Sequence, residues 1–332
     1  MLTRIGTLLL ALLLLPGSPV HAEWSKADRA IMGTAIHLEF WSEKQSQAQA
    51  QNLIDDVVAE FQRIDALMST YKEDSELSKV NRLAATEPVV VSEELFGLLE
   101  QALRYSVLSD GAFDITYASV GYMYDYRERV KPSDEEIAAK LGAINYRHVV
   151  LDPGQHSVRF ARQGVRVDLG GIAKGYAVDR AIGLLQAQGI AHALVSAGGD
   201  TRIIGDKRGR PWVTAIRDPR QREDFAALLP LSDTAISTSG DYERYFIEGD
   251  VRYHHIISPK TGKSAQASRS ATVLGPDATT TDALSTTVFI LGPKDGLALV
   301  NRLEGIDAVV IDSDGRMHYS DGLLRQQSEP PG

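Results

Sequence analysis

The residues best suited to chemistry lie in the stretch 165–180, which reads VRVDLGGIAKGYAVDR. Its apolar start predicts a strand over 165–168, its two glycines predict a turn, and the helix that follows is expected to begin near Ile172. Such a turn directs unpaired backbone N–H groups and the positive end of the helix dipole at one point, where a phosphate can bind. Lys174 would add a positive charge within the first helical turn, and Asp168 a carboxylate just before it. An ordinary strand-to-helix turn with a solvated lysine explains the same residues.

Asp282 and Thr286 form a second candidate pair, in a region whose pattern predicts a helix over 277–289. Residues four apart lie on one face of a helix, so this carboxylate and this hydroxyl would point the same way. Such a pair can bind a hard cation such as Mg²⁺ and leave coordination positions for water and substrate phosphates. A capping role for Asp282 and a packing role for Thr286 explain the same spacing, and spacing alone favours that structural interpretation.

His254 and His255 stand in a predicted strand over 251–257. Adjacent side chains of a strand point to opposite faces, so only one of the two is expected to face a given pocket. That histidine could act as a general base or donate a hydrogen bond to a phosphate, although a lone histidine in a strand more often has a structural role. Tyr71, at the end of a predicted helix, could stack on a flat ring or fill a half-buried packing position.

The elements that would position these residues are helices and short strands. Apolar spacing and capping residues predict helices at 46–68, 92–107, from Ser133 onward, 172–188, 277–289 and 294–303. Alternating or short apolar runs predict strands at 31–40, 147–151, 157–160, 165–168, 193–196, 201–204, 212–216, 234–237, 242–247, 251–257, 271–274, 308–312 and 316–319. A strand-rich middle with helices before and after it indicates an α+β fold, with mixed, largely antiparallel sheets flanked by helices.

The first 22 residues have the pattern of a cleavable signal peptide. Arg4 precedes the apolar run 8–15, which is too short to span a bilayer, and small residues surround the expected cut after Ala22. We therefore expect a periplasmic protein, with one domain over 23–325 that two interleaved subdomains could share, and a disordered tail at 326–332. No other stretch is expected to cross a membrane, so the mature chain would be peripheral to the inner membrane at most.

The composition excludes several classes of protein. The chain has 332 residues, no cysteine and a net charge of −9, which becomes −10 without residues 1–22 because Arg4 is their charged residue. An acidic exported protein is a poor candidate for binding nucleic acid. Without cysteine there is no disulfide and no thiolate, so a bound metal must use oxygen or imidazole ligands.

Taken in order, eight motifs of the chain resemble those of the ApbE-type FAD:protein FMN transferase family, and they extend over essentially the whole mature chain. The motifs are MGT at 32–34, STYKEDSELSKVN at 69–81, GAFDIT at 111–116, DLGGIAKGYAVD at 168–179, AGGD at 197–200, ISTSGDYERYF at 236–246, HHIISPKTG at 254–262 and DALSTTVFILG at 282–292.

The resemblance implies an enzyme that binds FAD and Mg²⁺, cleaves the pyrophosphate of FAD, attaches FMN to a Thr or Ser hydroxyl of an acceptor protein and releases AMP. Typical acceptors are exported flavoprotein subunits of respiratory or electron-transfer complexes. Matched residue by residue, the motifs imply that His255 is the base for the acceptor hydroxyl and that Tyr71 stacks on the flavin. The other implied FAD contacts are Met32, Ala112, Phe113, Asp114, Asp168, Lys174 and Ile257. The implied Mg²⁺ ligands are the Gly171 carbonyl, Asp282 and Thr286.

The chain departs from the family pattern at two places. Ser258 stands where the family usually has Asp, and residues 115–127 lack the Pro-Leu and Trp of many members, so the wall of the flavin pocket is expected to differ. Two other functions stay open. An FAD pyrophosphatase would release FMN and AMP from the same site, and a non-catalytic periplasmic flavin-binding protein would have no need for the pair Asp282 and Thr286.

Overall fold

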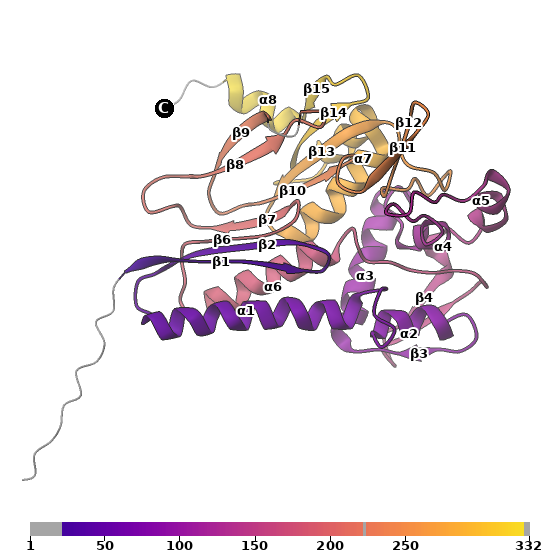
Figure 1. Ribbon diagram of the computed structural model, residues 1–332, viewed down its shortest axis with the longest axis horizontal. Helices are drawn as coiled ribbons and strands as arrows, with labels where there is room; N and C mark the ends of the chain where they lie inside the picture. Colours follow the sequence, from indigo (N-terminus) through magenta and orange to yellow (C-terminus); the bar gives the residue numbers. More distant parts are fainter. Residues whose placement is uncertain (1–21, 222–223, 329–332) are drawn as a thin grey trace, which may run out of the picture.

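The computed structural model describes residues 22–221 and 224–328, and its largest unit is an eight-stranded sheet in the order β1-β2-β6-β7-β10-β13-β14-β15 (Figure 1). All strand pairs found within these residues are antiparallel. The strands of this sheet are β1 (Glu23–Ile31), β2 (Thr34–Ser42), β6 (Ala193–Ala197), β7 (Asp200–Ile204), β10 (Ala235–Gly240), β13 (Ser268–Gly275), β14 (Asp307–Asp312) and β15 (Met317–Tyr319). The α+β fold with largely antiparallel sheets and flanking helices is confirmed.

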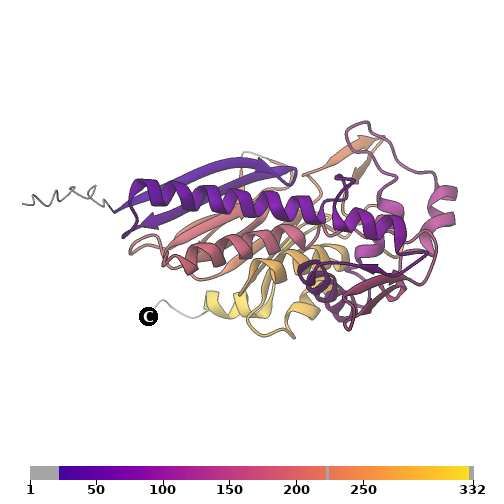
Figure 2. The ribbon, with the colours of Figure 1, turned by 90° about the horizontal axis from the view of Figure 1, so that it is seen from below.

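Three long helices pack against this sheet: α1 (Gln47–Met68), α6 (Ala173–Ala187) and α7 (Ala278–Val300). Figures 1 and 2 show α1 and α6 side by side under the first strands, and α7 packs under β10, β13 and β14. Helices α6 and α7 also pack against each other. The apolar residues between these helices and the sheet form the core, and the start of α6 meets the first half of α7 at its edge.

A smaller region of helices and short strands lies beyond one end of α1 and α6 (Figure 1). It contains α2 (Glu76–Leu83), α3 (Glu93–Leu108), α4 (Ala118–Gly121), α5 (Asp134–Leu141), β3 (Val89–Val90), β4 (Val149–Asp152) and β5 (Ser157–Phe160). Two separate ribbons and a terminal helix complete the fold: β8 (Trp212–Arg217) with β9 (Phe225–Leu231), β11 (Tyr245–Glu248) with β12 (Val251–His254), and α8 (Asp321–Ser328).

Local sequence signals define where the long helices begin and end. Ser133 caps α5 in a capping box and Ser92 caps α3, as predicted, and Ser46 also caps α1 in a capping box. Helix α7 is interrupted at Gly292, whose φ of 78° lies in the left-handed region that glycine tolerates. The two predicted helical stretches near the C-terminus are therefore confirmed as two helices joined across this break.

The predicted strand over 165–168 is wrong. This segment is extended but pairs with no strand in the described part of the chain; side chains bond most of its backbone, and the Asp168 N–H donates to the Ile115 carbonyl oxygen at 3.0 Å. The Asn81 amide donates to the carbonyl oxygen of Val167 and accepts from its N–H, both at 2.8 Å, and Ser119 Oγ accepts from the N–H of Arg166 at 3.0 Å. Because side chains from distant parts of the chain replace the ladder, the apolar pattern alone cannot distinguish this segment from a strand.

The predicted strand over 31–40 is also wrong, because it is two strands. Strand β1 ends at Ile31, the chain turns at Met32 and Gly33 with φ of 55° and 69°, and β2 begins at Thr34. Helix α2 and strand β9 were not expected from the sequence, and β4 begins only at Val149 because a 3₁₀ turn precedes it.

The expectations for the ends of the chain have mixed outcomes. The predicted signal peptide at 1–22 lies almost wholly outside the described residues, as do residues 329–332. The predicted tail at 326–332 starts too early, since α8 extends to Ser328. The expectation that no later stretch could span a membrane was too strict: among the described residues, α7 is long and apolar enough by length and composition. More than half of that apolar window is buried inside the protein, against the sheet and α6.

Candidate active site between helices α6 and α7

Helix α6 meets the first turns of α7 at very close range. The backbone N–H of Gly175 donates to Asp282 Oδ2 at 3.0 Å, and a Cβ at position 175 would overlap the carbonyl oxygen of Ala278. Asp179, one turn further along α6, accepts hydrogen bonds from the backbone N–H groups of Ala278 and Thr279 at 2.9 and 2.8 Å. N–H groups in a first helical turn have no partner inside the helix, so Asp179 caps α7 from outside. These contacts, which we call the α6–α7 junction, fix the two helices relative to each other.

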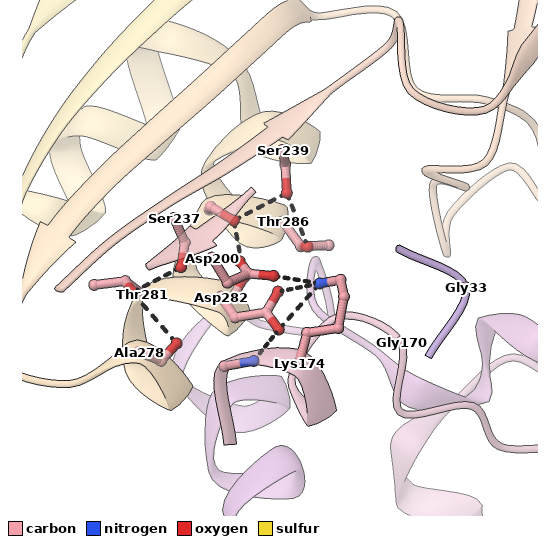
Figure 3. A network of polar contacts seen from close by, with 12 residues as sticks. Gly33, Gly170, Lys174, Asp200, Ser237, Ser239, Ala278, Thr281, Asp282 and Thr286 are labelled. Carbon is pink, nitrogen blue, oxygen red and sulfur yellow. Dashed lines mark hydrogen bonds and ion pairs between the residues drawn. The ribbon is translucent and has the colours of Figure 1, made fainter. Parts of the chain in front are cut away.

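Lys174 lies between two buried carboxylates at this junction (Figure 3). Its Nζ donates to Asp200 Oδ2 at 2.6 Å and lies 3.3 and 3.4 Å from the two carboxylate oxygens of Asp282. Asp200 opens strand β7, directly after the glycines of the AGGD motif. Lys174 therefore joins the sheet, α6 and α7 at one point.

The electrostatics follow from this arrangement. Burial raises the pKa of Asp282, and the neighbouring Asp200 raises it further, while Lys174 and the Gly175 N–H oppose the shift. Burial alone would lower the pKa of Lys174, but Asp200 and Asp282 outweigh it and hold the pKa above its ordinary value. Lys174 thus stays charged. An additional cation beside Asp282 would lower the pKa of its carboxyl and stabilise the ionised form.

Thr286 and Gly171 lie next to each other, as the predicted metal site requires. A Cβ built on Gly171 would be 3.3 Å from Thr286 Oγ1 and 3.2 Å from the Phe113 ring. Ser239 Oγ, which was not predicted to belong to this site, lies 3.2 Å from Thr286 Oγ1 (Figure 3). Asp282 and Thr286 share the same helix, so the three predicted ligands are brought to one region of the molecule. No cluster of three or more His, Asp or Glu suited to a metal occurs in residues 22–221 and 224–328.

The predicted array of unpaired N–H groups at the glycine turn is largely absent from the part of the chain that the structure describes. The N–H of Gly170 donates to Asp168 Oδ1, those of Ile172 and Ala173 donate to the Leu169 carbonyl oxygen, and that of Gly175 donates to Asp282. The turn therefore offers few open backbone N–H groups to a phosphate, and the positive charge of Lys174 beside it is shared with Asp200 and Asp282.

The two adjacent histidines have opposite environments. His254 is 2% exposed, its Nε2 lies 2.7 Å from the Ala265 carbonyl oxygen, and its Nδ1 accepts from the Ile256 N–H. His255 Nδ1 is buried without a hydrogen-bond partner among the described residues. Burial lowers the pKa of His255 to about 3, and the charges of Arg244 and Lys174 contribute to this shift. His254 is thus a structural residue, and His255 is the histidine with a ring nitrogen unpaired within the described chain, close enough to Arg244 and Lys174 for their charges to lower its pKa.

Asp168 and Tyr71 lie beside the glycine turn. Asp168 accepts hydrogen bonds from the hydroxyls of Thr70 and Tyr117 at 2.8 and 3.0 Å, which tie the end of α1 to the turn. Tyr71, the next residue after Thr70, is 86% exposed. An aromatic ring so exposed contributes little packing to the fold and is available to stack on a ligand.

The remaining residues predicted to contact FAD are mostly committed to the fold. Asp114 is buried, and its carboxylate accepts from Thr116 and from the Tyr146 N–H, so it supports the local turn. Ile257 is buried in a small apolar cluster with Val120 and Ile137. Ala112 is also buried, and Met32 forms the β1–β2 turn. Asp114 therefore has a structural role in this turn, whatever contact it makes with a ligand.

Two acidic residues of the junction had no predicted role. Asp200 holds Lys174, and the acidic residue after the double glycine of AGGD is the signal that could have indicated it. Asp179 stands at the end of the DLGGIAKGYAVD motif, where its spacing of one helical turn from Gly175 is compatible with a shared contact face. Neither role can be predicted from the sequence without knowing that α7 packs against α6.

A lysine at a helix start, held between buried carboxylates beside a glycine and a hydroxyl, defines a protein with a polar site suited to a phosphate-bearing ligand. The profile of the ApbE family matches residues 32–310, and the chain therefore belongs to the ApbE family.

Relatives and solved structures agree with this assignment over most of the chain. Proteins named FAD:protein FMN transferase are 33% identical in Treponema pallidum, covering 91% of this chain and 88% of that protein, and 33% identical in Vibrio cholerae, covering 96% of both. The fold is similar to the crystal structure of the ApbE protein from Thermotoga maritima, with a TM-score of 0.84 and 35% identity over 92% of this chain and all of that one. The flavin transferase ApbE from Vibrio cholerae gives a TM-score of 0.82 at 30% identity, covering 92% and 99% of the two chains.

Proposed function

We propose that this protein is an FAD:protein FMN transferase. It would cleave FAD, attach FMN through a phosphoester to a Thr or Ser hydroxyl of an exported electron-transfer protein, and release AMP. The observation that carries the proposal is the position of Lys174 between Asp200 and Asp282, at the place where α6 meets α7. Cleaving a pyrophosphate depends on positioning and on charge stabilisation, which this cluster of fixed charges can provide.

In the proposed step, the acceptor hydroxyl oxygen attacks the phosphorus of the FMN half of FAD, and the bond from that phosphorus to the bridging oxygen breaks. AMP leaves with the bridging oxygen and its electron pair, and the hydroxyl proton passes to His255. A pKa of about 3 keeps His255 neutral in the free protein. The negative charge of bound phosphates would raise that pKa toward the range of an effective base. Lys174 would bind phosphate oxygen, and the exposed Tyr71 would stack on the flavin.

Mg²⁺ belongs to the same proposal. The Gly171 carbonyl, Asp282 and Thr286 offer only oxygen, which Mg²⁺ prefers, and a set with one carboxylate leaves positions for water and phosphate. The ion would neutralise charge on the pyrophosphate and on the leaving AMP. The shorter contact of Lys174 is with Asp200. Asp282 can therefore bind a cation while Lys174 keeps its ion pair with Asp200.

We also propose export to the periplasm, where acceptor subunits on the outer side of the inner membrane would be accessible. The support is the leader pattern in residues 1–22. Strand β1 begins at Glu23, directly after the expected cleavage site, so removal of the leader would leave the sheet intact.

The test is to co-express the full chain with a Thr-bearing flavoprotein subunit of a respiratory complex and to analyse that subunit by mass spectrometry. A gain of one FMN less one water on a Thr or Ser, dependent on Mg²⁺, supports the transferase. Free FMN and AMP without covalent flavin would identify a pyrophosphatase instead. Bound but uncleaved FAD would identify a flavin-binding protein.

A further inference from the structure

A groove of about 720 Å³ opens beside the glycine turn, on the side of residues 163–166. It begins at Thr70, whose hydroxyl is bonded to Asp168, and it continues along Asn81 and Arg82 of α2 toward Tyr122. Lys174, His255 and Asp282 do not line it. The groove therefore adjoins the candidate active site at the Tyr71 end without being part of the α6–α7 junction.

The lining of the groove includes an aromatic ring with two cations close to it. Tyr122 is 49% exposed, the Arg166 guanidinium lies 4.4 Å from its ring centroid, and Lys140 Nζ lies 5.8 Å from it. Neither cation has an ion pair with a carboxylate among the described residues. In a chain of net charge −9, two cations without such partners on one ring mark a place where an anionic group can bind.

Two carboxylates line the groove close to Tyr71 in the sequence. Glu73 and Asp74 follow the exposed Tyr71 by two and three residues and are exposed, and Arg82, a third cation of the lining, donates to the Glu73 carbonyl oxygen at 2.7 Å. An anionic ligand is therefore repelled near Tyr71 and attracted at Tyr122. This distribution of charge suits an extended polypeptide. Its acidic residues would lie near Tyr122, some distance along the chain from the hydroxyl that reaches the flavin.

We propose that this groove binds an extended, acidic segment of the acceptor protein, with a carboxylate seated between Arg166 and Lys140 on Tyr122. The inference rests on the proposed function, because a transferase must hold a second macromolecule beside its flavin site and a hydrolase need not. The acceptor hydroxyl would then pass Thr70 and Tyr71 to reach the phosphates. The groove's volume, its opposite charges at different places along the lining and its position outside the junction fit a polypeptide better than a second small molecule.

The test uses a double charge reversal, Lys140→Glu with Arg166→Glu, in the full chain. Its matched control is Arg210→Glu with Arg302→Glu, two exposed residues outside the groove that give the same change in net charge. The probes are three synthetic peptides with a central Thr flanked by Glu, by Gln or by Lys. Transfer of FMN to each peptide is followed by mass spectrometry, and FAD binding is followed separately by flavin fluorescence.

We expect wild type and control to modify the Glu peptide best. The groove variant should show at least a tenfold higher KM for the Glu peptide, unchanged FAD affinity, and a reversed preference for the Lys peptide. A parallel loss of FAD affinity would make the groove part of the FAD site and overturn the proposal. Equal use of the three peptides, or of none, by wild type would also overturn it, whereas the co-expression experiment decides the proposed function independently.

Discussion

The α6–α7 junction and the Tyr71 side of the site differ in how their groups are satisfied. At the junction, Lys174, Asp179 and Asp282 all have partners within hydrogen-bond distance. On the Tyr71 side, the aromatic ring is exposed to solvent. The difference indicates that the charged centre is organised before ligand binds, while the ring that would contact the flavin obtains a stacking partner only from the ligand.

The largest effect on activity is expected from Asp282→Asn. The amide oxygen can still accept from the Gly175 N–H, and Lys174 keeps Asp200, so the junction should remain folded. FAD turnover should fall about a thousandfold, because charge stabilisation by a bound cation is worth several kcal/mol. Turnover is measured by AMP release, with Asp295→Asn, an exposed acid on the same helix, as the control. Full activity of Asp282→Asn would refute a metal role for this residue.

The two histidines give a matched pair of variants. His255→Gln should lower the rate of transfer about a hundredfold, which is the low end of the range for a lost general base. Its thermal stability should change little. His254→Gln should lower stability by about 1–3 kcal/mol, because it disturbs buried hydrogen bonds to Ala265 and Ile256, and should affect transfer less. Chemical denaturation and single-turnover transfer separate the two effects. The opposite pattern would assign the base to His254.

Gly175→Ala tests the close contact of the helices. Its methyl group would overlap the Ala278 carbonyl oxygen, so we expect a loss of about 2 kcal/mol in the free energy of unfolding. Gly183→Ala, on the same helix with nothing within 4 Å of its Cβ position, should instead be neutral or stabilising by up to about 1 kcal/mol. Denaturant titration distinguishes them, and equal stability of the two variants would contradict the junction geometry.

Tyr71→Ala should change the affinity for FAD and leave the stability of the fold unchanged. Loss of stacking should weaken FAD binding about tenfold, while the melting temperature stays unchanged because the ring is 86% exposed. Tyr71→Phe should retain the affinity. Wild-type FAD affinity in Tyr71→Ala would remove this residue from the flavin site.

The smallest expected effect is on the pH dependence of the free energy of unfolding in mild acid. His255 has a pKa of about 3 in the fold against an ordinary 6.5, so between these values the unfolded chain takes up a proton that the folded protein does not. Stability from this residue is therefore present above pH 6.5 and falls as the pH drops below it. His255→Gln should lose less stability than wild type between pH 7 and pH 6 in parallel denaturation curves. Identical slopes would show that His255 is not desolvated.

Local signals predicted the elements that carry the site but not the contacts between them. Helices α6 and α7, and the shared face of Asp282 and Thr286, follow from apolar spacing and capping residues. The segment 165–168 could not be distinguished from a strand, because Asn81 and Ser119 satisfy its backbone from far away in sequence. The roles of the FAD-contacting residues came from the motif resemblance and not from spacing.

Tertiary contacts explain what the sequence left undecided. The partner of Lys174 is 26 residues away in Asp200, on a strand that reaches α6 only in the folded sheet. The orientation of His254 and His255 depends on Ala265 and Arg244, which lie in other loops. Period-two alternation predicts that the two rings diverge, but the choice between them requires the packing around each.

The most direct measurement is a crystal of the full chain grown with FAD and Mn²⁺ in place of Mg²⁺, with anomalous scattering used to locate the ion. The account predicts one anomalous peak bounded by the Gly171 carbonyl, Asp282 and Thr286, in contact with the FAD phosphates, and Lys174 bonded to Asp200 without Asp282. A peak elsewhere, or FAD bound with no ion between α6 and α7, would contradict it.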